Sequence, residues 1–333
     1  MDYKPNMEDI KKLRTMTGAG LADVKKALTE AEGDFDRAKE LLRERGLAIA
    51  AKRSDRETSN GCVLVKKADG FAAMVAVKCE TDFVANGADF IAMTQSILDA
   101  AVAAKCKTLD EVKELEVGGQ KAQEIVTQRS GITGEKMELD GYLTLEGNNV
   151  EIYDHMGKHT LCTMVQLNKE NVDAGHKLAM QVAAMKPVAL DAQSVEQKIL
   201  DEEYKTAVEK TKLEQCQKAV ESALKKAGYN LYIAENEEHL AEGIAKGNIT
   251  EAQADDIRRI KVEVAEEKAK NLPAQMVENI AKGRVSKFLK ENCLVDQEFQ
   301  FGDGDKASVS QWLKKQDAEL AICDFKRFTL AAE

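Results

Sequence analysis

The sequence is poor in proline and in aromatic residues: it has only three prolines among 333 residues, and Phe, Trp and Tyr together make up 5%. Alanine, glutamate, lysine and leucine are abundant instead, which favours helices with a smaller share of strand. With 44% hydrophobic and 32% charged residues, the composition fits neither a disordered chain nor a membrane-spanning one. The length is sufficient for two or three domains.

An excess of positive charge is also missing. The chain has 48 Lys and Arg against 58 Asp and Glu, a formal net charge of −10. Residues 1–56 are nearly balanced, with 13 basic and 11 acidic side chains. Binding along a nucleic-acid backbone requires cations opposite many phosphates. We therefore expect no direct contact with nucleic acid.

Metal and redox motifs are not evident. The seven cysteines are an odd number, and the closest two, Cys62 and Cys79, are 17 residues apart, so neither a disulfide framework nor a CxxC site is predicted. His155 and His159 have the spacing of a helical metal-ligand pair, but Gly157 lies between them in a predicted turn. The segment 303–305, Asp-Gly-Asp, lacks the terminal Glu of a calcium loop. We expect no metal and no cofactor.

Catalytic motifs are absent as well. The sequence has no GxxxxGK phosphate loop, no GxSxG nucleophile turn and no GxGxxG between a strand and a helix. We therefore expect a protein that is not an enzyme and has no catalytic residues.

The first residues, Met1 to Asn6, are polar and lack the apolar run of a secretory signal peptide. We expect a cytoplasmic protein with no membrane partner.

The first 55 residues predict a helical bundle. Apolar residues recur at helical spacing in three stretches, which are separated by the glycines at 18 and 20 and by Gly33. Asp34 is suited to cap the third helix, and Gly46 is expected to end it. A basic, polar connector, Lys52 to Arg56, is expected to act as a linker.

The pattern of the residues after this bundle, from 56 onward, predicts an α+β core. A β-hairpin is expected from Cys62 to Cys79 around an Asp69-Gly70 turn, followed by a helix near Phe90. The same order recurs from Val150 onward, at an offset of 87 to 88 residues. We predict two related α+β subdomains of antiparallel sheet and helices, residues 56–140 and 141–300.

A long helical insertion is expected inside the second subdomain. Residues 195–227 and 250–270 are charged, with apolar residues at helical spacing, and predict an antiparallel helical hairpin or coiled coil over 195–270. Pro273 suits the start of a further helix. A short C-terminal module is expected over 301–333. An exposed pair of amphipathic helices also allows a homodimer through the hairpin.

The segment from Glu80 to Asn86 is the most informative loop. Phe83 and Val84 lie between the carboxylate of Asp82 and the polar start of the next helix. They could pack beneath that helix as part of the core. The corresponding connection of the second copy, residues 168–173, has no aromatic residue, so the fold does not require one there and Phe83 could serve another role.

Several motifs resemble bacterial elongation factor Ts. They are LRTMTGAGL at 13–21, KKAL at 25–28, Gly33-Asp34 with Ala38, TDFVA at 81–85, AAMKP at 183–187 and ENIAKGR at 278–284. The resemblance covers nearly the whole chain. It is weakest over residues 205–270, where the insertion looks longer than usual, and the basic residues common in the family are largely replaced around 134–140.

This resemblance implies a guanine-nucleotide exchange factor for elongation factor Tu, the GTPase that delivers aminoacyl-tRNA to ribosomes. The partner would be bound in its GDP-bound and nucleotide-free forms. The first bundle would be a ubiquitin-associated (UBA)-like domain docking on the GTPase through Leu13, Arg14, Thr17 and Gly18. Asp82 and Phe83, within the motif Thr81 to Val84, would disturb magnesium coordination and phosphate contacts.

Two other functions remain open at this point. A scaffold or chaperone-like adaptor would hold partners in complexes that do not respond to GDP. An enzyme with an unrecognised site would turn over a substrate. The exchange factor is favoured, because it accounts for the two leading motifs and needs no catalytic machinery.

Overall fold

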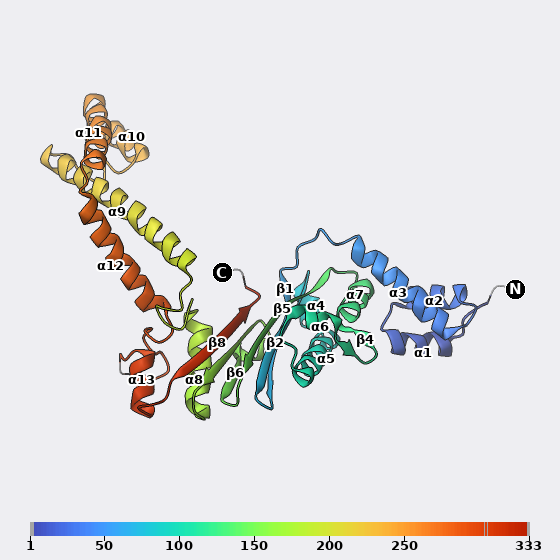
Figure 1. Ribbon diagram of the computed structural model, residues 1–333. Coiled ribbons are helices and arrows are strands. Elements are labelled where there is room, and N and C mark those ends of the chain that lie inside the picture. Colours follow the sequence, from blue (N-terminus) through green and yellow to red (C-terminus); the bar gives the residue numbers. More distant parts are fainter. Residues whose placement is uncertain (1–2, 303, 305, 332–333) are drawn as a thin grey trace. The chain divides into compact units, whose positions relative to one another are not determined.

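The protein is described by a computed structural model that covers residues 3–302, 304 and 306–331. It divides into two compact units, one formed by Met1–Pro187 with Glu298–Glu333 and the other by Val188–Gln297. Figure 1 shows helices and small antiparallel sheets, and the predicted α+β class is confirmed. Asp303 and Asp305 of the Asp-Gly-Asp segment lie outside the described residues.

The first unit begins with the three predicted helices, α1 (Met7–Thr17), α2 (Leu21–Glu30) and α3 (Phe35–Ala51). Gly18 ends α1 with a left-handed φ of 69°, which a residue without a Cβ adopts readily. Asp34 caps α3 by accepting hydrogen bonds from two backbone N–H groups. The apolar stripes meet in one small core of Ile10, Leu13, Ala19, Val24, Ala27, Leu28, Ala31 and Ala38.

Gly46 does not end α3, contrary to the sequence prediction. The helix continues for five more residues, and Gly46 is buried against α7 (Ala122–Thr133). A Cβ added to Gly131 of α7 would lie 2.2 Å from the Gly46 Cα atom. The absence of side chains at these two positions lets the backbones of α3 and α7 approach closely.

The predicted hairpin is confirmed. Strands β1 (Asn60–Ala68) and β2 (Phe71–Cys79) pair in antiparallel register through Asp69 and Gly70, both with positive φ as in a type I′ turn. Strand β5 (Met137–Glu146) pairs with the other edge of β2. Because β2 is central, its run of apolar residues is buried on both faces.

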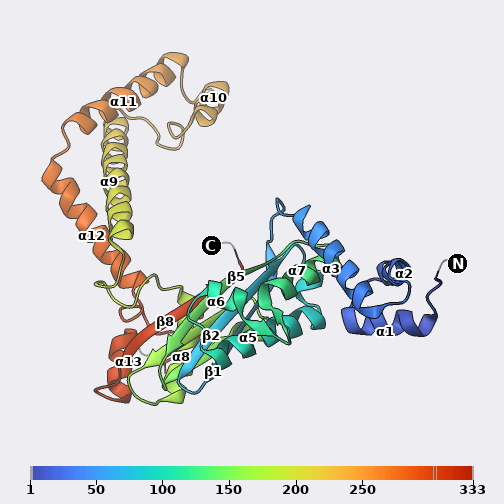
Figure 2. The ribbon, with the colours of Figure 1, turned by 45° about the vertical axis from the view of Figure 1, so that its right-hand side comes forward.

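The alternation of side chains along these strands explains the layers. Ala73, Val75 and Val77 face the core beneath α5 (Ala88–Ala104), whereas Ala72 and Met74 pack against a second sheet. That sheet has the order β6-β7-β8 and is formed by β6 (Val150–Asp154), β7 (Leu161–Leu167) and β8 (Ile322–Thr329). Helix α8 (Val172–Met185) packs on it. Figure 2 shows these elements from a second side.

Both sheets therefore belong to a hairpin followed by a long helix, in the order that the sequence suggested. That the two halves are related subdomains, with the boundaries given above, stays a prediction. The short C-terminal module predicted over 301–333 is not separate from the second sheet, because β8 hydrogen-bonds along β7 and completes that sheet.

The smaller elements are α6 (Leu109–Glu114), β3 (Glu116–Val117), β4 (Gln120–Lys121), the 3-10 turn His155–Gly157 and α13 (Val309–Gln316).

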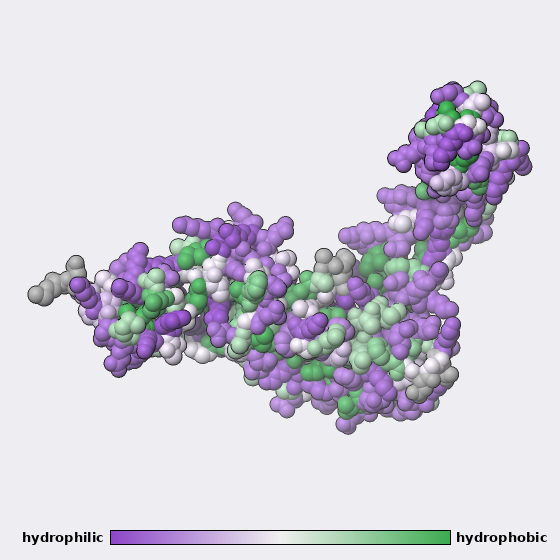
Figure 3. Space-filling view, turned by 180° about the vertical axis from the view of Figure 1, so that it is seen from behind, coloured by the Kyte–Doolittle hydropathy of each residue, from purple (hydrophilic) through white to green (hydrophobic). Residues whose placement is uncertain are grey.

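The second unit is helical and contains α9 (Gln197–Lys226), α10 (Glu237–Ala245), α11 (Glu251–Lys270) and α12 (Ala274–Asn292). Helix α9 packs against both α11 and α12, so the returning arm of the hairpin includes the helix that starts after Pro273. The connector contains α10, and with parts of α9 and α11 it encloses a small core around Leu224, Leu240 and Ile257. The surface seen in Figure 3 is mostly hydrophilic over this unit.

Within the part of the chain that the structure describes, no helix is both long enough and apolar enough to cross a membrane.

Candidate protein-binding site

The motif Thr81 to Val84 lies at the junction between β2 and α5. The sequence suggested a loop, and the structure has a single helical turn, α4 (Asp82–Ala85), followed by α5 after Gly87. Thr81 has an extended backbone and caps the turn, its hydroxyl oxygen accepting from the Val84 N–H at 3.4 Å. Such caps satisfy backbone donors that a helix start leaves free.

The residues of this turn have opposite environments. Ala85 is buried and Val84 is half-buried against the core beneath α5, whereas Asp82 is exposed and 88% of Phe83 is exposed. The interpretation that Phe83 packs beneath the helix is therefore wrong, although it holds for Val84. Two apolar residues anchor the turn, and the aromatic ring beside them faces solvent.

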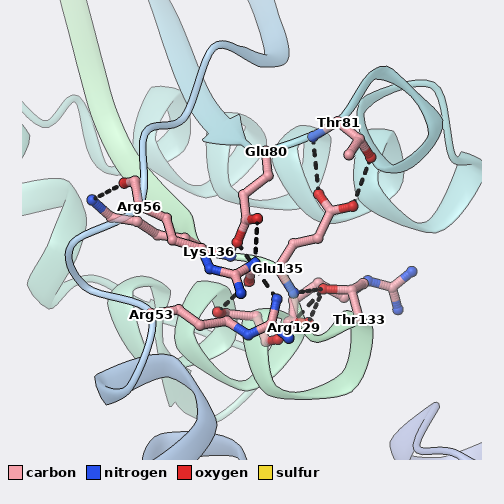
Figure 4. Close-up of polar contacts among 9 residues, drawn as sticks. Arg53, Arg56, Glu80, Thr81, Arg129, Thr133, Glu135 and Lys136 are labelled. Atoms are coloured by element: carbon pink, nitrogen blue, oxygen red, sulfur yellow. Dashed lines mark hydrogen bonds and ion pairs between the residues drawn. The ribbon is translucent and has the colours of Figure 1, made fainter.

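Glu135 fixes the start of the turn by accepting two hydrogen bonds from Thr81. The Thr81 backbone N–H donates to Glu135 Oε2 at 3.1 Å, and the Thr81 hydroxyl donates to Oε1 at 2.6 Å. Figure 4 shows the Glu135 side chain pointing at Thr81 from the segment that follows α7. Both the backbone and the hydroxyl of Thr81 are thereby fixed.

Glu80, one residue earlier, joins two further segments. Its carboxylate accepts from the Lys136 N–H at 2.6 Å and from Arg56 at 2.8 Å, and Arg53 lies 3.6 Å away. The Lys136 N–H holds the pKa of Glu80 below its usual range, and Arg56 and Arg53 act in the same direction. The segment 52–56, expected to be a linker, is thus attached to the base of the turn.

The sequence did not reveal Glu80 and Glu135 as site residues. Glu135 lies 54 positions after Thr81, and nothing in its local pattern indicates that contact. The only signals were that residues 134–140 depart from the family pattern and that 52–56 are basic. Figure 4 shows residues of both segments in contact with Glu80 or Thr81, directly before the turn.

The predicted docking residues of the bundle lie around the end of α1. Leu13 is fully buried in the bundle core, so it supports this surface from within. Arg14 is exposed, and Thr17 is half-buried with its hydroxyl bonded to the Leu13 carbonyl at 2.8 Å. A Cβ at Gly18 would lie 3.7 Å from the Arg129 side chain of α7. Met7, Met16 and Leu21 add exposed apolar surface to this bundle.

Other reactive groups are engaged locally. His155 bonds to Tyr153 at 3.1 Å and His159 to Asp154 at 2.5 Å, so the two rings have different partners. Burial raises the pKa of the Cys62 and Cys79 thiols to about 12, which suppresses the nucleophilic thiolate. Among the described residues, no three His, Cys, Asp or Glu side chains are grouped so that they could hold a metal ion.

Comparison with known proteins gives consistent results. Residues 80–332 match the family model described as Elongation factor TS. The chain is 56% identical over 327 residues to elongation factor Ts of Parabacteroides distasonis, covering 98% of this chain and 99% of that protein. The corresponding protein of Bacteroides fragilis is 56% identical over 328 residues, with the same coverage. That of Porphyromonas gingivalis is 37% identical over 329 residues, covering 98% of each chain. The chain therefore belongs to the elongation factor Ts family.

Proposed function

We propose that the protein is a guanine-nucleotide exchange factor for elongation factor Tu, that it binds the GTPase in GDP-bound and nucleotide-free forms, and that it acts by contact alone. Family membership supports the partner. The observation that carries the mechanism is the exposure of Phe83, 88%, on a turn whose neighbouring residues are anchored. A large apolar ring in water is unfavourable for the free protein and becomes favourable when a partner covers it.

The physical role of such a ring follows from how GDP is held. Magnesium and backbone N–H groups cradle its phosphates, so release requires a change in that cradle and no covalent step. An aromatic side chain buries about 150 to 250 Å² when it inserts into a partner. If the pocket exists only in the open partner, this burial favours the open state. The neighbouring carboxylate of Asp82 would act on the magnesium shell, because Mg²⁺ prefers oxygen ligands.

The required free energy indicates that Phe83 does not act alone. Weakening GDP binding about 10⁴-fold requires a preference of about 5.5 kcal/mol for the nucleotide-free partner. A single hot-spot residue contributes about 2 to 4 kcal/mol. The bundle around Arg14, Thr17 and Gly18 is proposed as a second docking surface, with Leu13 supporting it, and Thr81 and Val84 as the support of the Phe83 turn.

The decisive experiment measures GDP release from elongation factor Tu with the wild-type chain and with Phe83→Ala. We expect Phe83→Ala to lose about 1 to 3 kcal/mol of stabilisation of the exchange transition state. Val172→Ala is the matched control, since Val172 is 57% exposed at the start of α8. Equal stimulation by Phe83→Ala and wild type contradicts the role of the ring. If the wild-type chain does not accelerate release, the proposed function itself is wrong.

A titration of the complex with GDP distinguishes the exchange factor from an adaptor that only binds the GTPase. Linkage requires that, if the chain weakens GDP binding, GDP weakens binding of the chain by the same factor. We therefore expect added GDP to dissociate the complex. A complex that resists saturating GDP would favour the adaptor.

A further inference from the structure

We propose that Glu135 is a positioning residue for the Phe83 turn: its two hydrogen bonds from Thr81 fix the orientation in which α4 presents the ring. This inference rests on the proposed exchange function for its activity readout. It adds a residue outside the Thr81–Val84 motif, on a segment 54 positions later in the chain. The physical question is what prevents a four-residue helix from rotating or fraying.

Apolar burial alone does not fix the turn. Val84 and Ala85 pack on the core, but such contacts are non-directional and a single helical turn is intrinsically unstable. Asp82 and Phe83 project outward, and both are exposed. Directional bonds therefore define which way the outer side chains point. At the C-terminal end the Asn86 side-chain amide donates to the Asp82 carbonyl at 2.8 Å, and this bond stays within the turn. A bond from the N-terminal end to the rest of the subunit is needed to orient the turn as a whole.

The Glu135–Thr81 contact supplies that direction. Glu135 accepts from both the backbone and the hydroxyl of Thr81, and the same hydroxyl oxygen accepts from the Val84 N–H. Two of these bonds form a continuous chain from the Glu135 carboxylate through the Thr81 hydroxyl to Val84, the first of the two anchored residues, and the third holds the Thr81 backbone. Hydrogen bonds in such a chain polarise one another, and those to a carboxylate are about twice as strong as neutral ones.

Glu135 is itself held by the end of α7. Its backbone N–H donates to Thr133 Oγ1 at 3.2 Å, and its carbonyl oxygen accepts from the hydroxyl of Ser130, which is almost fully buried. Val126 of α7 lies in the core beneath α5. The carboxylate thus projects from a fixed backbone, which is what a positioning group requires.

Variants at both ends of the contact test this inference. Glu135→Ala removes both acceptors and Thr81→Val removes the hydroxyl at nearly constant shape. Glu135→Gln retains one oxygen acceptor, and Thr81→Ser retains the hydroxyl. Glu138→Ala is the matched control, because Glu138 lies on the adjoining strand and bonds to Thr58 at 2.7 Å and Lys136 at 2.9 Å rather than to α4.

The activity measurement distinguishes a loss of binding to the partner from a loss of the correct orientation of the Phe83 ring. We expect Glu135→Ala and Thr81→Val to lower the maximal rate of GDP release by about 10- to 100-fold, the effect of losing a charge-assisted hydrogen bond. The concentration for half-maximal stimulation should change less than about threefold, since other surfaces still dock. Thr81→Ser and Glu135→Gln should recover part of the rate. The double variant should be little worse than either single one, because both break the same contact.

A second readout does not depend on the partner. Amide hydrogen exchange of the free chain should accelerate about 10-fold or more at residues 82–86 in Glu135→Ala, while α5 stays protected. The control Glu138→Ala should leave residues 82–86 unchanged. Unchanged exchange there in Glu135→Ala overturns the inference, as does a wild-type maximal rate. If wild type itself fails to release GDP, the proposed function fails, and hydrogen exchange still decides whether Glu135 orders the turn.

Discussion

Glu80 is the residue at which three segments meet. Its carboxylate bonds to the Lys136 backbone and to Arg56, and only 17% of its side chain is exposed. These contacts stabilise the ionised form and lower the pKa of Glu80 from its ordinary value. A group whose pKa is lower in the folded than in the unfolded chain stabilises the fold above the unfolded pKa. That contribution disappears as the pH falls through the folded value.

The corresponding prediction compares wild type with Glu80→Gln in urea denaturation. At pH 7 the variant should be less stable by about 1 to 3 kcal/mol, because it loses the charge-assisted bonds but keeps the shape. The difference should shrink as the pH falls below the ordinary carboxyl range near 4.5. A difference that is constant from pH 7 to pH 3 would show that the charge of Glu80 is not responsible.

At this same scale, the sequence left Phe83 ambiguous for a physical reason. Each residue of a helix is rotated by about 100° from the last, so Phe83 and Val84 face different directions although both are apolar. The sequence alone does not place the start of a four-residue helix accurately enough to decide which side chain faces outward. The absence of an aromatic residue at 168–173 pointed to the correct alternative, whereas the Glu135–Thr81 contact had no local signal.

At the scale of elements, the contact between α3 and α7 depends on two glycines that are not equivalent. A Cβ on Gly131 would lie 2.2 Å from the Gly46 Cα atom, which requires the helices to separate. A Cβ on Gly46 would lie 3.7 Å from the Gly131 Cα atom, an ordinary contact. The same chemical change on the two sides of one contact should therefore have opposite consequences.

We predict that Gly131→Ala destabilises the protein by about 1 to 3 kcal/mol through overpacking. Gly46→Ala should be neutral or stabilising by about 0.5 to 1 kcal/mol, since alanine is the better helix former. Thermal unfolding of the two variants measures this difference. Amide hydrogen exchange of α3 and α7 locates it, because only Gly131→Ala should expose the contact. Equal destabilisation by both would contradict the asymmetry of the contact.

Elements defined by local chemistry were predictable, and those defined by distant contacts were not. The Asp69-Gly70 turn between two apolar runs specifies its hairpin, and Asp34 specifies the start of α3. Gly46 was misinterpreted because a glycine that ends a helix and one that admits a neighbouring backbone look alike in sequence. The residue that distinguishes them, Gly131, lies 85 positions later.

At the scale of the whole molecule, chain segments far apart in sequence complete the same structures. Strand β8 joins the second sheet about 160 residues after its neighbour β7, so a C-terminal segment that looked separate contributes to a sheet core. In the helical unit, α12 packs on α9 as α11 does. Periodicity predicted each helix, but not which helices would share a partner, because apolar stripes carry no information on pairing.

The helical unit also allows the homodimer that the sequence suggested, and we propose that it associates through exposed apolar residues of α9 and α11. Leu213 is 59% exposed and Val262 58% exposed. A second copy that covers such residues would gain about 25 cal/mol of free energy for each Å² of apolar surface that it removes from water. Two carboxylates at these positions, Leu213→Glu with Val262→Glu, should oppose association because they would have to be desolvated without partners.

Sedimentation velocity over a range of concentrations tests this prediction. Wild type should sediment with the mass of two chains at high concentration, and the double variant with the mass of one. Lys212→Glu is the matched control, since it introduces a carboxylate on exposed α9 surface without removing an apolar side chain. Because the unit has its own core around Leu240 and Ile257, these surface changes should leave its helix content unchanged. A wild-type chain that sediments as a single copy at every concentration would exclude the dimer, and Leu213 and Val262 would then be isolated apolar residues of an ordinary surface.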